Sequence, residues 1–175
     1  GRLSFRIFIP SKRERYGVKI FMLCESDSGY LSSFMIYTGS STDYGHLADN
    51  ILLKPWDQYK SPSKVVLSLL QAYFNQGYIL TLDNYYTSPE LVNALLNLGT
   101  DCLGTLRKKE GLPKNFWNWK PIKGNDPIKQ FSGDILVLRW NDVTKTKSTK
   151  IVSMMSTVHT GKLVDSGKTR CYSVL

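Results

Sequence analysis

Residues 78–88 read Tyr-Ile-Leu-Thr-Leu-Asp-Asn-Tyr-Tyr-Thr-Ser, an apolar run that ends in a carboxylate just before the start of a helix. The run is short, contains β-compatible residues and follows Gly77, which predicts a buried strand of the parallel-sheet type. Asp83 then lies at the carboxyl end of this strand, where α/β folds gather ligand-binding and catalytic groups. Asp83 is therefore a candidate metal ligand. The alternative is that its carboxylate caps the loop or the next helix.

Two helices are predicted on either side of this strand. Ser61-Pro62 and Ser88-Pro89 each combine an N-cap serine with proline at the first helical position. The first helix is expected to run from Ser61 to Asn75 and the second from Ser88 to Gly99. Their buried stripes are expected to be Val66, Leu69, Leu70 and Tyr73, and Leu91, Ala94, Leu95 and Leu98. A further strand is predicted over residues 102–106.

The whole pattern predicts a mixed α/β sheet. Residues 5–10 suggest a short strand, and residues 18–37 suggest an antiparallel hairpin. The helix–strand–helix–strand order that follows indicates parallel strands joined by right-handed crossovers. After residue 110, strands are predicted at residues 135–140 and 150–155, whereas the aromatic residues 116–119 are expected to form a loop. We therefore expect a core over residues 1–110, an inserted β-rich, aromatic segment over 111–150, and a return to the core over 151–175.

Length and composition suit one globular domain, with 175 residues of which 42% are hydrophobic. No apolar stretch approaches 18 residues and no leader is visible, so we expect a soluble, intracellular chain without a membrane partner. Cys24, Cys102 and Cys171 are far apart, which argues against a disulfide framework or a zinc site. Cys24 and Cys102 are expected in the core. The chain starts at Gly1 and stops in a strand-like stretch, which suggests a fragment of a longer protein.

The net charge of +9 is unevenly distributed. The first 19 residues are basic, residues 20–106 are acidic overall, and the remainder is basic again. This layout suits a protein that holds a polyanion with its flanks and keeps carboxylates for metal near the middle. The alternative is that the lysines and arginines only solubilise surface loops.

Four segments occur in the order and at roughly the spacing found in one family. They are Tyr16-Gly-Val-Lys-Ile20, Leu80-Thr-Leu-Asp-Asn-Tyr-Tyr-Thr-Ser88, Gly104-Thr-Leu-Arg107 and Met155-Ser-Thr-Val-His159. Over most of its length the chain thus resembles piggyBac-type transposases and the proteins derived from them. The resemblance implies an RNase H-like catalytic domain that cuts and joins DNA with two divalent ions, Mg²⁺ or Mn²⁺, held by three carboxylates.

In the family's pattern Asp83 would be the second of these carboxylates. The first would precede residue 1. The third would follow a segment like residues 151–158, where this chain has His159, so Asp165 is a weak candidate and Asp142 a weaker one. His159 could ligate a metal or orient a water, but a lone histidine at a strand end is more often structural. Because one carboxylate cannot position two ions, we expect the fragment to be inactive by itself.

Basic residues are the expected contacts with DNA phosphates. Arg107, Lys108 and Lys109 follow a strand that should end on the same side of the sheet as Asp83, and Lys12, Arg13 and Arg15 form a second basic loop. Trp117 and Trp119 either stack on a base or pack the inserted β-structure. The resemblance also implies nuclear localisation and a possible homodimer in the full-length protein. The rival interpretations are a domesticated, non-catalytic DNA-binding or interaction protein, and a basic α/β adaptor.

Overall fold

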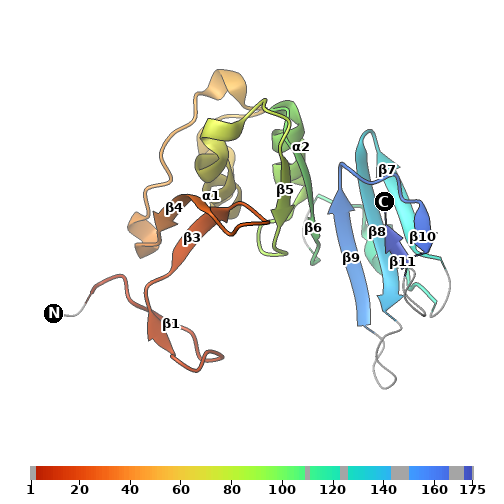
Figure 1. The fold of residues 1–175 in the computed structure, drawn as a ribbon, viewed down its shortest axis with the longest axis horizontal. Coiled ribbons are helices and arrows are strands. Elements are labelled where there is room, and N and C mark those ends of the chain that lie inside the picture. Colours follow the sequence, from red (N-terminus) through yellow and green to blue (C-terminus); the bar gives the residue numbers. More distant parts are fainter. Residues whose placement is uncertain (1–2, 109–110, 123–125, 143–149, 166–171, 175) are drawn as a thin grey trace. The chain divides into compact units, whose positions relative to one another are not determined.

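The computed structural model describes residues 3–108, 111–122, 126–142, 150–165 and 172–174 (Figure 1). The chain forms two compact units, Gly1–Tyr73 (unit 1) and Phe74–Leu175 (unit 2). Of the elements predicted around the 78–88 segment, the first helix lies in unit 1, and the second helix and both strands lie in unit 2. The domain boundaries predicted at residues 110 and 150 remain a prediction.

Unit 1 is built from two hairpins and one helix. Strands β1 (Ile7–Phe8) and β2 (Tyr16–Gly17) pair antiparallel, as do β3 (Ile20–Cys24) and β4 (Leu31–Ile36). The predicted hairpin over residues 18–37 is therefore confirmed. The segment after β4 contains three short 3-10 helices, η1 (Gly39–Ser41), η2 (Asp49–Ile51) and η3 (Trp56–Gln58).

Helix α1 (Ser61–Leu70) packs on one face of the β3–β4 hairpin and continues into η4 (Gln71–Tyr73). The Ser33 hydroxyl on β4 donates a hydrogen bond of 2.8 Å to the carbonyl of Leu69. Of the predicted stripe, Val66 and Leu70 are buried, whereas Leu69 and Tyr73 are only partly buried. Val65 and Leu67 are buried as well, although they were not predicted. The opposite face of the hairpin is exposed, and Cys24 lies on the exposed side. The prediction that Cys24 is a core residue is wrong.

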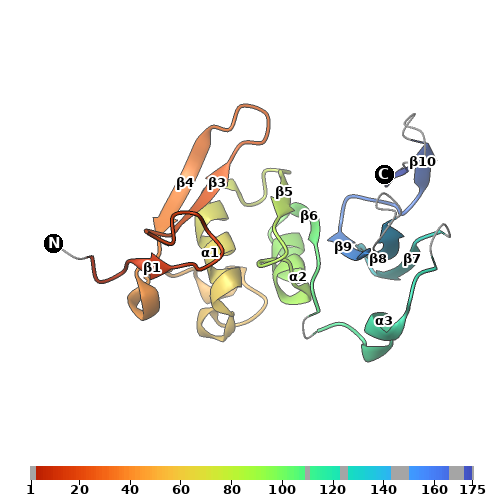
Figure 2. The same cartoon turned by 90° about the horizontal axis from the view of Figure 1, so that it is seen from below.

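Unit 2 contains a five-stranded mixed sheet in the order β5-β6-β9-β8-β7. Strand β5 (Ile79–Leu82) pairs parallel with β6 (Asp101–Thr105), and α2 (Pro89–Asn97) connects them and packs on β6 (Figure 2). The four predicted stripe residues of α2 are all buried. The mixed α/β class predicted from the sequence is thus confirmed.

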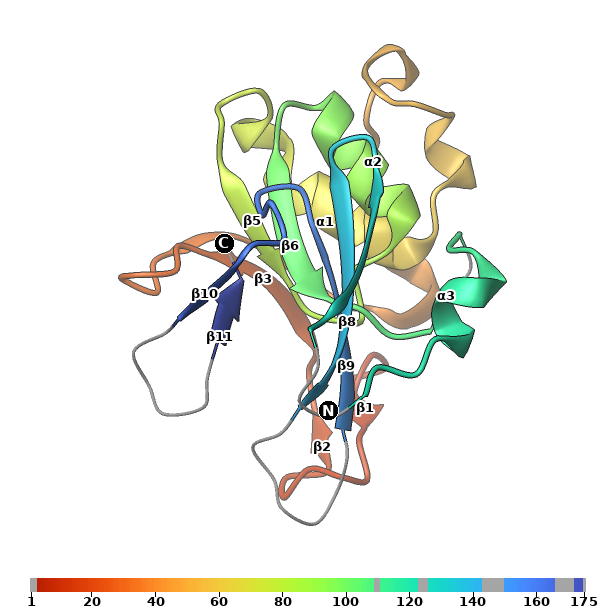
Figure 3. The ribbon, with the colours of Figure 1, turned by 90° about the vertical axis from the view of Figure 1, so that its right-hand side faces the viewer.

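The antiparallel part of this sheet consists of β7 (Ile128–Ser132), β8 (Ile135–Asp142) and β9 (Lys150–Ser156) (Figure 3). Strand β9 also pairs antiparallel with β6, so the β8–β9 hairpin extends the same sheet as the parallel pair. Strands β10 (Leu163–Asp165) and β11 (Tyr172–Val174) form a separate two-stranded pair. Strand β7 was not predicted, because its polar positions weaken the alternation.

Residues 116–119 were predicted to form a loop, but they belong mostly to the short helix α3 (Lys114–Asn118). The reason is tertiary, since Phe116 is fully buried and Arg139 of β8 donates a 2.8 Å hydrogen bond to its carbonyl. The Arg139 guanidinium also lies 5.7 Å from the ring centre of Trp117. Trp117 therefore packs against the sheet rather than standing free to stack on a base.

Among the described residues, none of the helices has the length and hydrophobicity of a bilayer-spanning segment. The longest, α1, has 10 residues.

The two Ser-Pro helix starts differ in structure. Ser88 is the N-cap of α2, and its hydroxyl accepts a hydrogen bond from the Leu91 N–H at 3.3 Å. In α1 the N-cap is Lys60 rather than the predicted Ser61, and no side chain caps that helix.

We therefore expect Ser88→Ala to lower the free energy of unfolding by about 1 kcal/mol. Ser61→Ala is the matched control, and it should change stability by less than about 0.5 kcal/mol. Urea denaturation of both variants measures the difference. Equal losses would contradict the capping assignment.

Candidate functional site

Asp83 follows the last residue of β5 and its side chain is exposed. Its Oδ1 accepts a hydrogen bond of 3.0 Å from the Tyr85 N–H, which closes a turn of the Asx type. Among the described residues, no hydrogen bond reaches the second carboxylate oxygen. Asp83 thus caps the loop with one oxygen and presents the other at the end of the strand.

The main chain of Asp83 is held even more tightly than its side chain. Its carbonyl accepts hydrogen bonds from the N–H of Tyr86 at 3.0 Å, from the N–H of Thr87 at 3.1 Å and from the Thr87 hydroxyl at 3.0 Å. Thr87 is completely buried. The loop between β5 and α2 is therefore rigid at the residue that carries the candidate function.

Strand β6 passes very close to this loop at Gly104. Gly104 lies opposite Leu82 in the parallel register. A Cβ atom at Gly104 would lie 2.4 Å from the Thr87 hydroxyl oxygen and 2.6 Å from the Leu82 carbonyl oxygen. The absence of a side chain at residue 104 is what lets β6 lie against the turn that positions Asp83.

Arg107 comes two residues after β6 and reaches the same loop. Its Nε donates a hydrogen bond of 2.8 Å to Asn84 Oδ1, and its Nη2 donates to the same oxygen. The prediction that Arg107 lies on the same side of the sheet as Asp83 therefore agrees with the geometry. A guanidinium carries five N–H donors, and within the described part of the chain the other three have no hydrogen-bond acceptor.

The hydroxyl of Tyr86 also belongs to this neighbourhood. Burial, followed by the charges of Tyr85 and Asp83, raises the pKa of Tyr86 above its usual value. Tyr86 is therefore a neutral hydrogen-bond donor at physiological pH.

Sequence reasoning singled out Asp83 and Arg107 but missed Asn84, Thr87 and Gly104 as their supports. The available signal was the pair of segments 80–88 and 104–107, which carry all five residues. Neither segment reveals by itself that the two loops touch.

The donor set can be tested against a divalent metal. One exposed carboxylate oxygen fits as a ligand for Mg²⁺ or Mn²⁺. Within the described residues, however, no group of three histidine, cysteine, aspartate or glutamate side chains could hold an ion. Asp165 lies at the end of β10 and Asp142 at the end of β8, and the side chains of both are outside the described part of the structure. No catalytic step through two ions follows from these residues.

His159 has a structural partner. Its Nδ1 lies 2.7 Å from the hydroxyl oxygen of the buried Ser156, and that oxygen accepts hydrogen bonds from the N–H groups of Val158 and His159. The arrangement closes the turn after β9. It supports the structural interpretation of His159.

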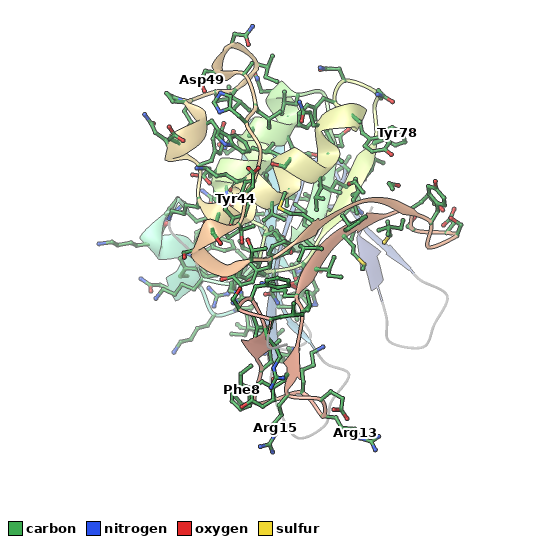
Figure 4. All side chains as sticks on the ribbon, turned by 90° about the vertical axis from the view of Figure 1, so that its left-hand side faces the viewer. Phe8, Arg13, Arg15, Tyr44, Asp49 and Tyr78 are labelled. Atoms are coloured by element: carbon green, nitrogen blue, oxygen red, sulfur yellow. The ribbon has the colours of Figure 1, made fainter. Side chains whose placement is uncertain are left out.

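The remaining predicted contacts are basic. Lys108 is exposed directly after Arg107, whereas Lys109 lies outside the described residues. Lys12, Arg13 and Arg15 are exposed in the loop that joins β1 to β2 in unit 1. Figure 4 shows Arg13 and Arg15 extending from that hairpin.

A family model described as Transposase IS4, which represents piggyBac-type transposases, matches residues 1–172. The chain belongs to this transposase family. The resemblance stated from the four sequence segments is thereby confirmed.

A solved structure supports the same assignment. The chain is similar to the piggyBac transposase in a cryo-EM structure of a synaptic complex with hairpin DNA, with a TM-score of 0.71 and 25% sequence identity. The match covers 90% of this chain but 30% of the piggyBac chain. This transposase-family chain therefore corresponds to less than a third of that relative.

Proposed function

We propose that this chain is the part of a transposase that holds DNA beside a metal-binding carboxylate within an RNase H-like domain. Support comes from one observation above all. Asp83 and Arg107 follow neighbouring parallel strands, and Asn84 ties the guanidinium to the loop that Asp83 begins. A carboxylate and a cation at one sheet edge suit a phosphodiester whose charge must be neutralised near a metal ion.

The roles of the side chains follow from their positions. Arg107 would donate its remaining N–H groups to a DNA phosphate while Asn84 fixes its orientation. Lys108, Lys109, Lys12, Arg13 and Arg15 would add phosphate contacts. Asp83 would supply one oxygen to Mg²⁺ or Mn²⁺, and Asp165 is the weak candidate for another ligand. Bound metal would activate the attacking oxygen and stabilise the leaving one.

The metal role can be measured without catalysis. Mn²⁺ should broaden the NMR signals of the backbone amides of Asp83 to Tyr86, and Asp83→Asn should abolish that broadening. Because no three histidine, cysteine, aspartate or glutamate side chains gather around an ion site among the described residues, binding should be weak and the chain alone should not cleave a transposon-end duplex. Unchanged broadening in Asp83→Asn, or cleavage that requires Asp83, would contradict this assignment.

DNA binding gives a second prediction. Arg107→Ala should weaken duplex binding about equally for all sequences and lower the slope of log affinity against log salt by about 1. Fluorescence anisotropy over a salt series measures both. Lys120→Ala removes an exposed cation from unit 2 and should leave the affinity nearly unchanged. An unchanged salt slope in Arg107→Ala would remove Arg107 from the interface.

A non-catalytic descendant of a transposase is the second candidate function. The observation in its favour is that Asp83 already has a structural role, because its Oδ1 caps the Tyr85 N–H. In that case Arg107→Ala would reduce DNA binding, but Mn²⁺ would broaden no signals near Asp83. Nuclear localisation and a homodimer of the full-length protein belong to both proposals.

A further inference from the structure

The β1–β2 hairpin presents two aromatic rings on its surface. Phe8 and Tyr16 lie directly opposite each other in the two strands, with ring centroids 4.9 Å apart and an interplanar angle of 46°. Their side chains are 50% and 59% exposed. These rings therefore contact each other while a large part of each remains accessible.

One cation contacts this aromatic pair, and three more lie in the loop of the same hairpin. The guanidinium of Arg6 lies 4.2 Å from the ring centre of Tyr16, and the connecting loop carries exposed Lys12, Arg13 and Arg15. Glu14 is the one acidic residue between residues 6 and 17. Figure 4 shows that Phe8, Arg13 and Arg15 all extend from this hairpin, Phe8 and Arg13 on opposite sides of it in that view. Exposed rings on the same hairpin as several exposed cations favour an anionic partner that also has flat groups.

A single strand of DNA has both properties, because it combines phosphates with bases whose faces are open. In a duplex the bases are stacked inside and cannot reach a protein ring without being extruded. The phosphate contacts alone would explain the cations but leave the rings unused. An unpaired strand would use both.

We propose that the β1–β2 hairpin binds an unpaired DNA strand, with Phe8 and Tyr16 stacking on bases and Lys12, Arg13 and Arg15 contacting phosphates. This inference rests on the proposed DNA-binding function and specifies the form of the DNA. Arg6 does not block the site, since an exposed cation–π contact is weaker than a base–aromatic stack. An incoming base can replace Arg6 over Tyr16, and the released guanidinium can then pair with a phosphate.

The test compares a fluorescent single strand with the same strand in which central nucleotides are abasic. Tyr16→Leu should weaken binding to the intact strand by about 5- to 150-fold, equivalent to about 1–3 kcal/mol. It should leave binding to the abasic strand unchanged, because phosphates and cations remain. Tyr16→Phe keeps a ring and should restore the preference for the intact strand.

Tyr30→Leu is the matched control. Tyr30 is 71% exposed, but it lies at the β3–β4 turn beside the acidic residues Glu25 and Asp27. This variant should bind both strands like the original chain. Circular dichroism should show whether each variant remains folded, and a Tyr16→Leu variant that unfolds is replaced by Phe8→Leu, for which the same preference is expected to fall.

Three outcomes would overturn the inference. The first is equal loss on intact and abasic strands, which would make Tyr16 a structural residue only. The second is an original chain that binds a duplex but has no preference for intact over abasic strands, in which case the proposed function survives. The third is binding to vesicles of anionic phospholipid with no base preference, which would assign the hairpin to a membrane surface. Failure to bind any DNA would instead refute the proposed function itself.

Discussion

Gly104→Ala should destabilise unit 2 severely. The added Cβ would meet the Thr87 hydroxyl oxygen at 2.4 Å, the Leu82 carbonyl oxygen at 2.6 Å and the Leu82 Cβ at 2.9 Å. Two of these three contacts involve the strand that pairs with β6, and Thr87 is fully buried, so neither neighbour can move cheaply. Overpacking of this kind costs about 1–3 kcal/mol and in tight sites more. That is a large part of the total stability of a domain.

Urea denaturation followed by tryptophan fluorescence measures this effect, because three of the four tryptophans, Trp117, Trp119 and Trp140, belong to unit 2. Gly17→Ala is the control, since no atom lies within 4 Å of a Cβ at that position. Adding Thr87→Ala to Gly104→Ala should recover part of the loss but not all of it, because the Leu82 carbonyl remains in the way. A Gly104→Ala variant as stable as Gly17→Ala would mean that β6 does not lie against this loop.

Leu95→Ala should have the second large effect. Leu95 is completely buried in α2, so truncation leaves a cavity as well as removing apolar contact. The expected loss is about 2–5 kcal/mol. Because α2 begins at Pro89 and its N-cap Ser88 directly follows the Asp83 loop, loosening this helix should also weaken the support of the candidate site.

Leu96→Ala makes the same chemical change one residue later, at a position that is only partly buried. Its cost should be less than half that of Leu95→Ala. Hydrogen exchange of the β5 and β6 amides would report the local effect, with faster exchange in Leu95→Ala than in Leu96→Ala. Equal exchange in the two variants would contradict the packing of α2 on this sheet.

Local signals predicted much of unit 2. The apolar run 79–82, the Ser88-Pro89 start and the turn at Gly99 each involve neighbours in sequence, and they gave a strand, a helix start and a helix end at the expected places. The prediction that this strand is buried is wrong, because β5 is an edge strand of the sheet and Ile79 is 56% exposed, whereas Leu82 is buried. Capping and periodicity act over a few residues, so they can be recognised in one segment. The same Ser-Pro pattern gave the wrong N-cap for α1, where Lys60 rather than Ser61 precedes the first helical turn.

Contacts between distant segments were not predictable in this way. The Cys102 N–H donates to the Thr157 hydroxyl at 2.9 Å, and the Thr157 N–H donates to the Cys102 carbonyl at 2.9 Å, which joins β6 to the end of β9. Cys102 is also buried, and burial, followed by the charge of Asp101, raises the pKa of its thiol to about 12. The sequence of neither segment predicts that the two pair, because the pairing of strands depends on how well whole surfaces pack together.

The sequence by itself determined the family, the carboxylate at the end of β5 and the basic residues that follow β6 and connect β1 to β2. Only the tertiary structure decided that Asn84 holds Arg107, that β6 needs a glycine against Thr87, and that Phe8 and Tyr16 share one exposed face with Arg6. The physical reason is the distance along the chain over which each interaction acts. Residue types and short spacings are fixed along the chain, whereas close approach between loops exists only once the sheet has brought both partners together.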